Sequence, residues 1–265
     1  MLELAAFFIV KTPFLNDINI FNIFSNNIEL AKAISMVILA LAFIGWRPRY
    51  TCILHWWVVW SFATKAIVQD GGDQISQVLT MLLIPICLTD SRRWHWEKER
   101  TPTKDFEKHF SIIAWFAMIL IALQISVLYF QAATAKFNVE EWANGTSMFY
   151  WIQNPIFGIS KQLSDLLMPL FANAIIVTIT TYGALLLEIL LFMAIAMKPS
   201  QQSVLMWMGI AFHLAILILF GLVSFFFAMS AALILYLGPK KGFRLNWKMP
   251  QALKTWHTPI PLIRD

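Results

Sequence analysis

Charged residues are scarce in this chain of 265 residues, where Asp, Glu, Lys and Arg together make up 13%. A water-soluble domain needs more charge than that to cover its surface. The hydrophobic share of 59% and the mean hydropathy of +0.66 agree, so the sequence predicts an integral membrane protein with the lipid bilayer as its surroundings. The formal net charge of +5 does not indicate nucleic-acid binding, because no soluble basic domain is present to carry it.

Cysteines, repeats and alternating polar patterns are also lacking. The two cysteines, Cys52 and Cys87, are too few for a disulfide framework, and their spacing fits no metal cluster. No third ligand stands at a suitable spacing beside Glu188 and His213, so we expect no metal. The absence of an internal repeat argues against a transporter with paired halves. Without short segments of alternating polarity, the fold class is an all-α helical bundle rather than a barrel.

Long hydrophobic runs, in contrast, are abundant and predict a polytopic bundle of about six to seven transmembrane helices. The runs are 28–45, 51–69, 74–89, 110–135, 174–197, 203–220 and 222–237. The last two are separated only at Gly221, so one long kinked helix is an alternative there. We divide the chain into an N-terminal interfacial segment at 1–27, a transmembrane domain at 28–240 and a basic tail at 241–265.

The distribution of Lys and Arg predicts the orientation. One side of the predicted bundle carries fifteen of them, and the other carries only Lys11, Lys136 and Lys161. Because positive residues accumulate in cytoplasmic loops, the basic side with the C-terminus is expected in the cytoplasm. The segment 136–173 is then expected on the outer side.

Few ionisable residues fall within the predicted spans, where they are costly and usually face the bundle interior. Glu188 and His213 lie near the middle of neighbouring antiparallel spans and could meet at one depth. A structural carboxylate–imidazole pair and a catalytic pair both remain open. Lys65 stands one turn before the outer end of its span, and Asp70 and Asp73 follow it. These groups predict either a structural ion pair or a contact with substrate or partner.

The run at 110–135 ends in polar residues with helical spacing. Ser126, Tyr129, Ala133 and Lys136 recur at intervals of three, four and three, which places them on one helical face. A second polar edge holds Gln124, Gln131 and Thr134. A lipid-facing helix would not carry these groups, so this helix is expected to border protein or a cavity. Lys136 is either a snorkelling anchor or a lysine in an apolar pocket that acts as a base.

The stretch after Lys136 favours the second interpretation. "NVEEWANG" predicts a turn or short interfacial helix that contains Trp142 and ends at Gly145. The aromatic "SMFYWIQNPIFG" is interrupted by Asn, Pro and Gly, so it is expected to lie along the membrane. Together they predict an aromatic re-entrant or interfacial lid at the outer face. Glu140 and Glu141 either tune the lysine, bind a partner or form a solvated turn.

The stretch "YFQAATAKFNVEEWANGTSMFYW" resembles the lysine–tryptophan–glycine segment of the vitamin K-dependent γ-carboxylase-like transmembrane domain, called the HTTM domain. Within that family it is most similar to the SdpB branch, bacterial membrane proteins required to mature a secreted sporulation-delaying peptide toxin. Three further stretches fit the pattern in order, namely "GWRPRYTCILHWWVVWSFATKAIVQDGGDQ", "YGALLLEILLFMAIAM" and "AFHLAILILFGLVSFF".

The resemblance implies roles for individual residues. Lys136 would be the base that deprotonates a reduced membrane quinone, such as menaquinol or vitamin K hydroquinone. Trp142, Gly145 and Tyr129 would border the cofactor, His213 would line the cavity, and Glu188 matches an acidic position of the family.

The resemblance also implies a location and partners. It places the chain in a bacterial plasma membrane as a multi-pass protein. The sequence ends near the close of the membrane domain, so a small SdpA-like accessory protein is expected to help recognise the precursor peptide. The expected function is maturation or modification of a secreted peptide toxin, by a γ-carboxylase-like membrane enzyme. The alternative is a non-catalytic membrane chaperone, export partner or immunity partner of the same peptide.

Overall fold

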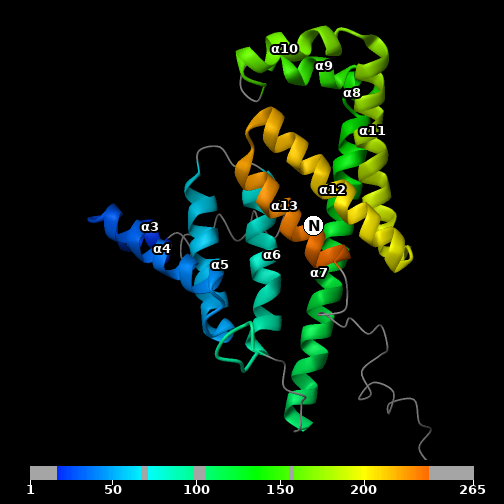
Figure 1. Ribbon diagram of the computed structural model, residues 1–265. Coiled ribbons are helices and arrows are strands. Elements are labelled where there is room, and N and C mark those ends of the chain that lie inside the picture. The colour runs from blue at the N-terminus through cyan, green and yellow to red at the C-terminus, as the bar shows by residue number, and fades with distance from the viewer. Residues whose placement is uncertain (1–16, 67–70, 98–104, 155–157, 239–265) are drawn as a thin grey trace, which may run out of the picture. The chain divides into compact units, whose positions relative to one another are not determined.

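The computed structural model describes residues 17–66, 71–97, 105–154 and 158–238, and the regular elements within these ranges are all helices (Figure 1). They are α3 (Ile20–Ile23), α4 (Ile28–Phe43), α5 (Pro48–Lys65), α6 (Gly71–Leu88), α7 (Asp105–Phe137), α8 (Glu140–Ala143), α9 (Ser147–Ile152), α10 (Lys161–Phe171), α11 (Ala174–Met193), the short 3₁₀ helix η1 (Ala194–Ala196), α12 (Pro199–Phe220) and α13 (Val223–Leu237). These residues form two compact units, and α6 and α7 contribute to both. The second unit comprises 71–75, 120–154 and 158–238.

In the first unit, the chain before α4 is attached to α5. The side-chain amide of Asn19 donates to the carbonyl oxygen of Ser61 at 3.1 Å and to Thr64 Oγ1 at 2.7 Å. The indole N–H of Trp57 donates to the Ile18 carbonyl at 2.7 Å. Polar side chains thus anchor the end of the predicted interfacial segment 1–27, of which residues 1–16 lie outside the described chain.

The turn between α4 and α5 is tied to the chain after α6. The Arg47 N–H donates to the Arg93 carbonyl at 2.7 Å, and the His95 N–H donates to the Gly45 carbonyl at 2.8 Å. Beside this junction, Arg92 Nη2 and Asp90 Oδ2 form an ion pair of 2.7 Å. Burial raises the pKa of the Asp90 carboxyl, but the hydrogen bonds and charge of Arg92 outweigh burial and hold that pKa below its usual range.

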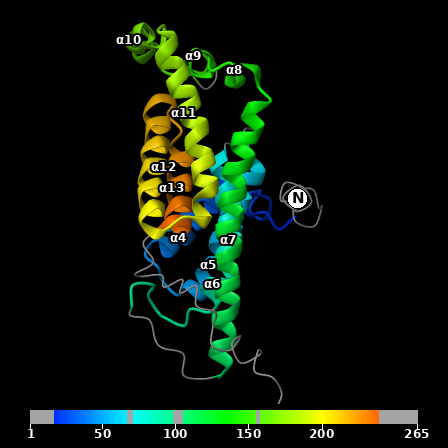
Figure 2. The ribbon, with the colours of Figure 1, turned by 90° about the vertical axis from the view of Figure 1, so that its right-hand side faces the viewer.

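In the second unit, α12 and α13 form an antiparallel hairpin (Figure 2). The turn is made by Gly221, whose φ of 70° lies in the left-handed region that glycine adopts without a Cβ clash. Gly209 allows the two helices to approach, since a Cβ on it would lie 2.7 Å from Leu233 Cδ1. The alternative of a single kinked helix across Gly221 is therefore wrong.

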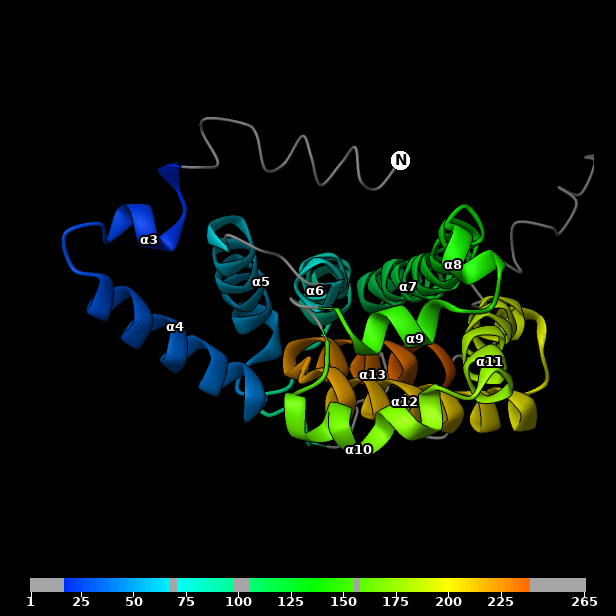
Figure 3. The ribbon, with the colours of Figure 1, turned by 90° about the horizontal axis from the view of Figure 1, so that it is seen from above.

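Three short helices connect α7 to α11. Seen from above, α10 lies lengthwise in the plane of the view, whereas α11 points toward the viewer (Figure 3). Ile152 of α9, Phe171 of α10 and Val177 of α11 form a small buried cluster that holds these elements together. Ser160 begins α10, because its hydroxyl accepts from the Leu163 N–H at 3.4 Å.

Helices occupy all seven predicted hydrophobic runs, but not all are long and apolar enough to cross a bilayer. Among the described residues, four qualify by length and composition, namely Gly71–Leu88, Ile112–Phe137, Ala174–Ala196 and Pro199–Phe220. The apolar helix Val223–Leu237 is shorter. The described part of the chain is all-helical, its long apolar helices are those of a membrane protein, and the count of six to seven spans stays a prediction.

Candidate functional site

The predicted face of α7 is buried within the second unit. Ser126, Tyr129 and Ala133 are almost completely inaccessible, whereas Gln131 and Thr134 of the second polar edge are exposed. The Ser126 hydroxyl donates to the Phe192 carbonyl of α11 at 2.9 Å. That carbonyl belongs to the last turn of α11, where carbonyl groups lack helical partners. The face therefore packs on α11, and Lys136 continues it in the last turn of α7.

Lys136 forms a two-pronged ion pair with Glu188. Its Nζ lies 2.6 Å from Oε1 and 2.8 Å from Oε2 of that carboxylate, and it also donates to the Ala132 carbonyl at 3.3 Å. The Lys136 side chain is 25% exposed, whereas that of Glu188 is 7% exposed. The carboxylate is thus enclosed by protein, while the amine remains open on one side.

Trp142 completes the surroundings of the amine. Lys136 Nζ lies 5.3 Å from the centre of its ring, a cation–π distance. Trp142 is itself buried against Ala184 and Leu185 of α11, with Phe212 of α12 packed on the same cluster. The indole therefore faces the protein interior beside the ion pair.

The chain after Trp142 turns sharply at Gly145. Its φ is 73°, and a Cβ there would lie 2.9 Å from Cε2 of Tyr182 and 3.3 Å from Cγ2 of Thr178. Both the dihedral angle and the close approach require glycine. The Tyr182 hydroxyl donates to the Ala143 carbonyl at 2.7 Å and thereby holds α8 on α11. The short helix at 140–143 and its end at Gly145 agree with the sequence prediction.

His213 is paired with Tyr129 rather than with Glu188. The Tyr129 hydroxyl and His213 Nε2 lie 3.1 Å apart, and the two residues are 1% and 2% exposed. The rings of Phe212 and Phe225 contact the imidazole edge to face, each with centres 5.2 Å away. The hydrogen bonds of the described residues therefore join Glu188 to Lys136 and His213 to Tyr129, and none of them forms the carboxylate–imidazole pair that the sequence left open.

The contacts with α11 run in antiparallel order, which explains why Glu188 meets Lys136. In chain order, they are Ser126 with Phe192, Lys136 with Glu188, Trp142 with Leu185 and Met148 with Thr181. Fourteen residues of α11 precede Glu188 and extend past the end of α7. At 1.5 Å per residue, this extension is about 20 Å long.

The other candidate residues lie outside this cluster. Glu140 and Glu141 are exposed in α8. Lys65 is exposed at the end of α5 in the first unit, whereas Asp73 belongs to the second unit and Asp70 lies outside the described residues. Their predicted ion pair and partner contacts stay predictions. Among the described residues, no three His, Cys, Asp or Glu side chains are grouped so as to hold a metal ion.

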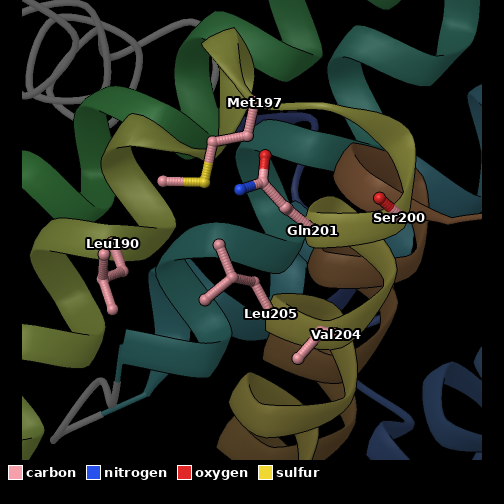
Figure 4. A pocket seen from close by; sticks show the side chains of 6 residues that line it. All are labelled: Leu190, Met197, Ser200, Gln201, Val204 and Leu205. Carbon is pink, nitrogen blue, oxygen red and sulfur yellow. The ribbon is translucent and has the colours of Figure 1, made fainter.

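A shallow apolar hollow of about 380 Å³ does not coincide with the candidate site (Figure 4). It lies between the end of α11 and the start of α12, and its lining residues are Leu190, Met197, Ser200, Gln201, Val204 and Leu205. None of these is a candidate residue. The candidate residues of the second unit therefore lie outside this hollow.

Comparison with known proteins identifies the family. The HTTM domain profile matches residues 14–240. The chain is 35% identical over 228 residues to the sporulation-delaying protein SdpB of Bacillus subtilis (strain 168), a match that covers 86% of this chain and 70% of SdpB. The chain is an HTTM-domain protein of the SdpB family. The protein YitO of the same strain is also 35% identical, over 226 residues, with 84% of this chain and 72% of YitO covered. No solved structure matches the chain.

Family membership agrees with the sequence resemblance, and the structure adds residues that sequence reasoning missed. Tyr182 and Thr181 anchor α8 and α9 on α11, and Phe212 and Phe225 enclose His213. Nothing in the apolar composition of these helices distinguishes the four positions, and the spacing of six residues between Tyr182 and Glu188 does not place them on one helical face.

Proposed function

We propose that this chain is the membrane component that matures or modifies a secreted precursor peptide, with Lys136 as a base. Similarity to the sporulation-delaying protein SdpB supports the choice of a peptide-maturation role. The chain would lie in the bacterial plasma membrane with its C-terminus in the cytoplasm, so that Lys136 works at the outer face. The enzyme would resemble the γ-carboxylase in using a proton-abstracting lysine.

The observation that carries this proposal is the Lys136–Glu188 pair. A lysine can act as a base only after it has lost a proton, and Glu188 is placed to take that proton across the 2.6 Å hydrogen bond. Burial penalises charged groups, so an ion pair and a neutral amine–acid pair differ less in free energy here than in water. The neutral amine of Lys136 then has a lone pair, which would take a substrate hydroxyl proton once the amine turns from the Glu188 acid toward its open side. Its partial exposure leaves room for that contact.

A reduced membrane quinone fits the groups around the amine. The Trp142 ring offers an aromatic surface 5.3 Å from Nζ, and Phe212 extends the apolar wall. The hydroxyl of a quinol is a proton donor that could reach Lys136 from the bilayer. When bound, the quinol would supply reducing equivalents for chemistry on the peptide.

The precursor peptide would approach from the exposed side of α8. Glu140 and Glu141 lie there in the first turn of that helix, close in sequence to Lys136 and open to solvent. They are suited to bind a basic segment of the peptide or of an SdpA-like accessory protein. Lys65 and Asp73 are further candidates for such a contact.

The test is mass spectrometry of the peptides secreted by cells that express the wild type, Lys136→Ala or Lys161→Ala. Lys161 is an exposed lysine at the start of α10 and serves as the matched control. In cells with the wild type or Lys161→Ala, we expect one secreted peptide to have the mass of its processed form. In cells with Lys136→Ala at equal protein abundance, the same peptide should keep its unprocessed mass. Normal processing by Lys136→Ala would reject the base and favour a non-catalytic chaperone, export or immunity role.

A further inference from the structure

The buried imidazole of His213 has an unmet hydrogen-bonding group. Its Nε2 is paired with the Tyr129 hydroxyl, but its Nδ1 has no hydrogen-bond partner within the described part of the chain. The residue is 2% exposed. A buried polar atom without a partner is costly, so its retention calls for a ligand or another explanation.

The pairing with Tyr129 determines which nitrogen carries the proton. A neutral imidazole has one donor and one acceptor nitrogen. If Nε2 carried the proton, the Tyr129 hydroxyl hydrogen would lack an acceptor, because His213 is its sole hydrogen-bond partner among the described residues. If the hydroxyl donates to Nε2, only one donor is left unmet. The second arrangement is favoured, and it makes Nδ1–H a donor that needs an acceptor.

Two paths of contacts connect His213 with the Lys136 amine. Because Lys136 Nζ reaches back to the Ala132 carbonyl, the amine lies about one helical turn from the level of Tyr129. A second path joins the same groups through aromatic rings. Lys136 contacts the Trp142 ring, Trp142 packs with Phe212, and the Phe212 ring meets His213 edge to face.

The surroundings indicate which acceptor suits the donor. Phe212 and Phe225 contact the imidazole, and a Cβ on Gly71 would lie 3.1 Å from the Phe225 ring. Such an apolar enclosure favours an uncharged ligand with one acceptor oxygen on a flat apolar body. A charged headgroup or a polar peptide side chain would lose its hydration there without compensation.

We propose that His213 Nδ1–H donates a hydrogen bond to an oxygen of the apolar ring compound on which Lys136 acts. This inference rests on the proposed function and assigns His213 to ligand binding. Tyr129 is a positioning residue, since it fixes the tautomer through Nε2. One oxygen of the ring compound would then face the amine, and another would face the imidazole.

The test uses menadione, a naphthoquinone without a long tail, and protein purified in detergent. Infrared difference spectra report hydrogen bonding as a downward shift of a menadione carbonyl band, and a binding titration gives the affinity. His213→Gln places an amide near Nε2, so it keeps a partner for Tyr129 but lacks the Nδ1 donor. His213→Asn places an amide near Nδ1 and keeps the donor. Thermal unfolding verifies that both variants are folded.

We expect the wild type and His213→Asn to show the shifted carbonyl band. In His213→Gln the shift should be lost, and affinity should fall about tenfold, as for loss of one neutral hydrogen bond. An unchanged band and affinity in His213→Gln would overturn the inference, while the secreted-peptide test of Lys136 would be unaffected. Failure of the wild type to bind menadione would overturn the inference and the quinone part of the proposed function together.

Discussion

Lys136 and Glu188 are 52 residues apart in the chain, yet the lysine Nζ lies 2.6 Å and 2.8 Å from the two carboxylate oxygens. The pair joins the last turn of α7 to the C-terminal third of α11. The carboxylate is enclosed and the amine is partly open. In the proposed mechanism, Glu188 therefore holds a proton and Lys136 meets the substrate.

Glu188→Gln tests whether Glu188 takes a proton from Lys136 or only packs against it. Glutamine has the size of glutamate and can still accept a hydrogen bond from Lys136, but its amide cannot take the lysine proton. We expect peptide maturation to fall by at least about a hundredfold, the usual contribution of a proton-transfer group. The measurement is the ratio of processed to unprocessed peptide by mass spectrometry at matched protein abundance. Maturation at the wild-type level would show that Glu188 has only a structural role.

The ion pair also predicts a non-additive effect on stability. Lys136→Met leaves the buried Glu188 carboxylate without its partner and should lower the free energy of unfolding by on the order of 3 kcal/mol. In Lys136→Met/Glu188→Leu neither charge remains, so most of that loss should be regained. Thermal unfolding in detergent compares the wild type with the three variants, including Glu188→Leu alone. If the losses of the single variants simply add in the double variant, the coupling is refuted.

Gly145 and Gly183 offer a matched pair of glycine-to-alanine changes. Gly145→Ala forces an L-residue into a φ of 73° and brings a methyl group to 2.9 Å from the Tyr182 ring, so we expect a loss of about 1–3 kcal/mol. Gly183 lies in the middle of α11 with nothing within 4 Å of a Cβ, so Gly183→Ala should stabilise by about 0.5–1 kcal/mol through helix propensity. Thermal unfolding of both variants measures the difference, and equal effects would contradict this account of the turn.

Asp90 predicts a pH dependence in the first unit. In the folded protein, Arg92 outweighs burial and lowers the pKa of the Asp90 carboxyl. The ionised carboxylate therefore stabilises the fold above the unfolded-state pKa of about 3.9. This stabilisation is lost as the pH falls through the folded-state pKa. Asp90→Asn should therefore cost about 1 kcal/mol at pH 7, since solvent screens this partly buried pair to some extent. At a pH below the folded-state pKa, wild type and variant should unfold at similar temperatures. A constant difference at all pH values would exclude the ion pair as its source.

Much of the helical framework could be predicted from the sequence, because hydrophobic runs are long and helix ends carry recognisable residues. The spacing of Ser126, Tyr129 and Ala133 correctly indicated a buried face, and Gly145 correctly indicated a helix end. Gly221 was ambiguous, because glycine can either kink a helix or end it. The left-handed φ at Gly221 shows that it ends α12.

The position of each polar residue along its predicted span did not reveal which residues pair with one another. Counting residues placed Glu188 and His213 near the middle of their spans, which suggested that they meet. In the structure, α11 extends past the end of α7, so Glu188 lies beside Lys136 instead. The length of this extension depends on α8 and α9 packing along α11, a tertiary contact that single-sequence periodicity does not contain.

The most direct test of the central claim is the maturation activity of Lys136→Arg at wild-type protein abundance. Arginine keeps the positive charge and can pair with both oxygens of Glu188, but it does not give up a proton in a protein. The account predicts unprocessed peptide with Lys136→Arg, as with Lys136→Ala, together with near-wild-type thermal stability for the arginine variant alone. Normal processing by Lys136→Arg would contradict a base and show that the site requires only a charge.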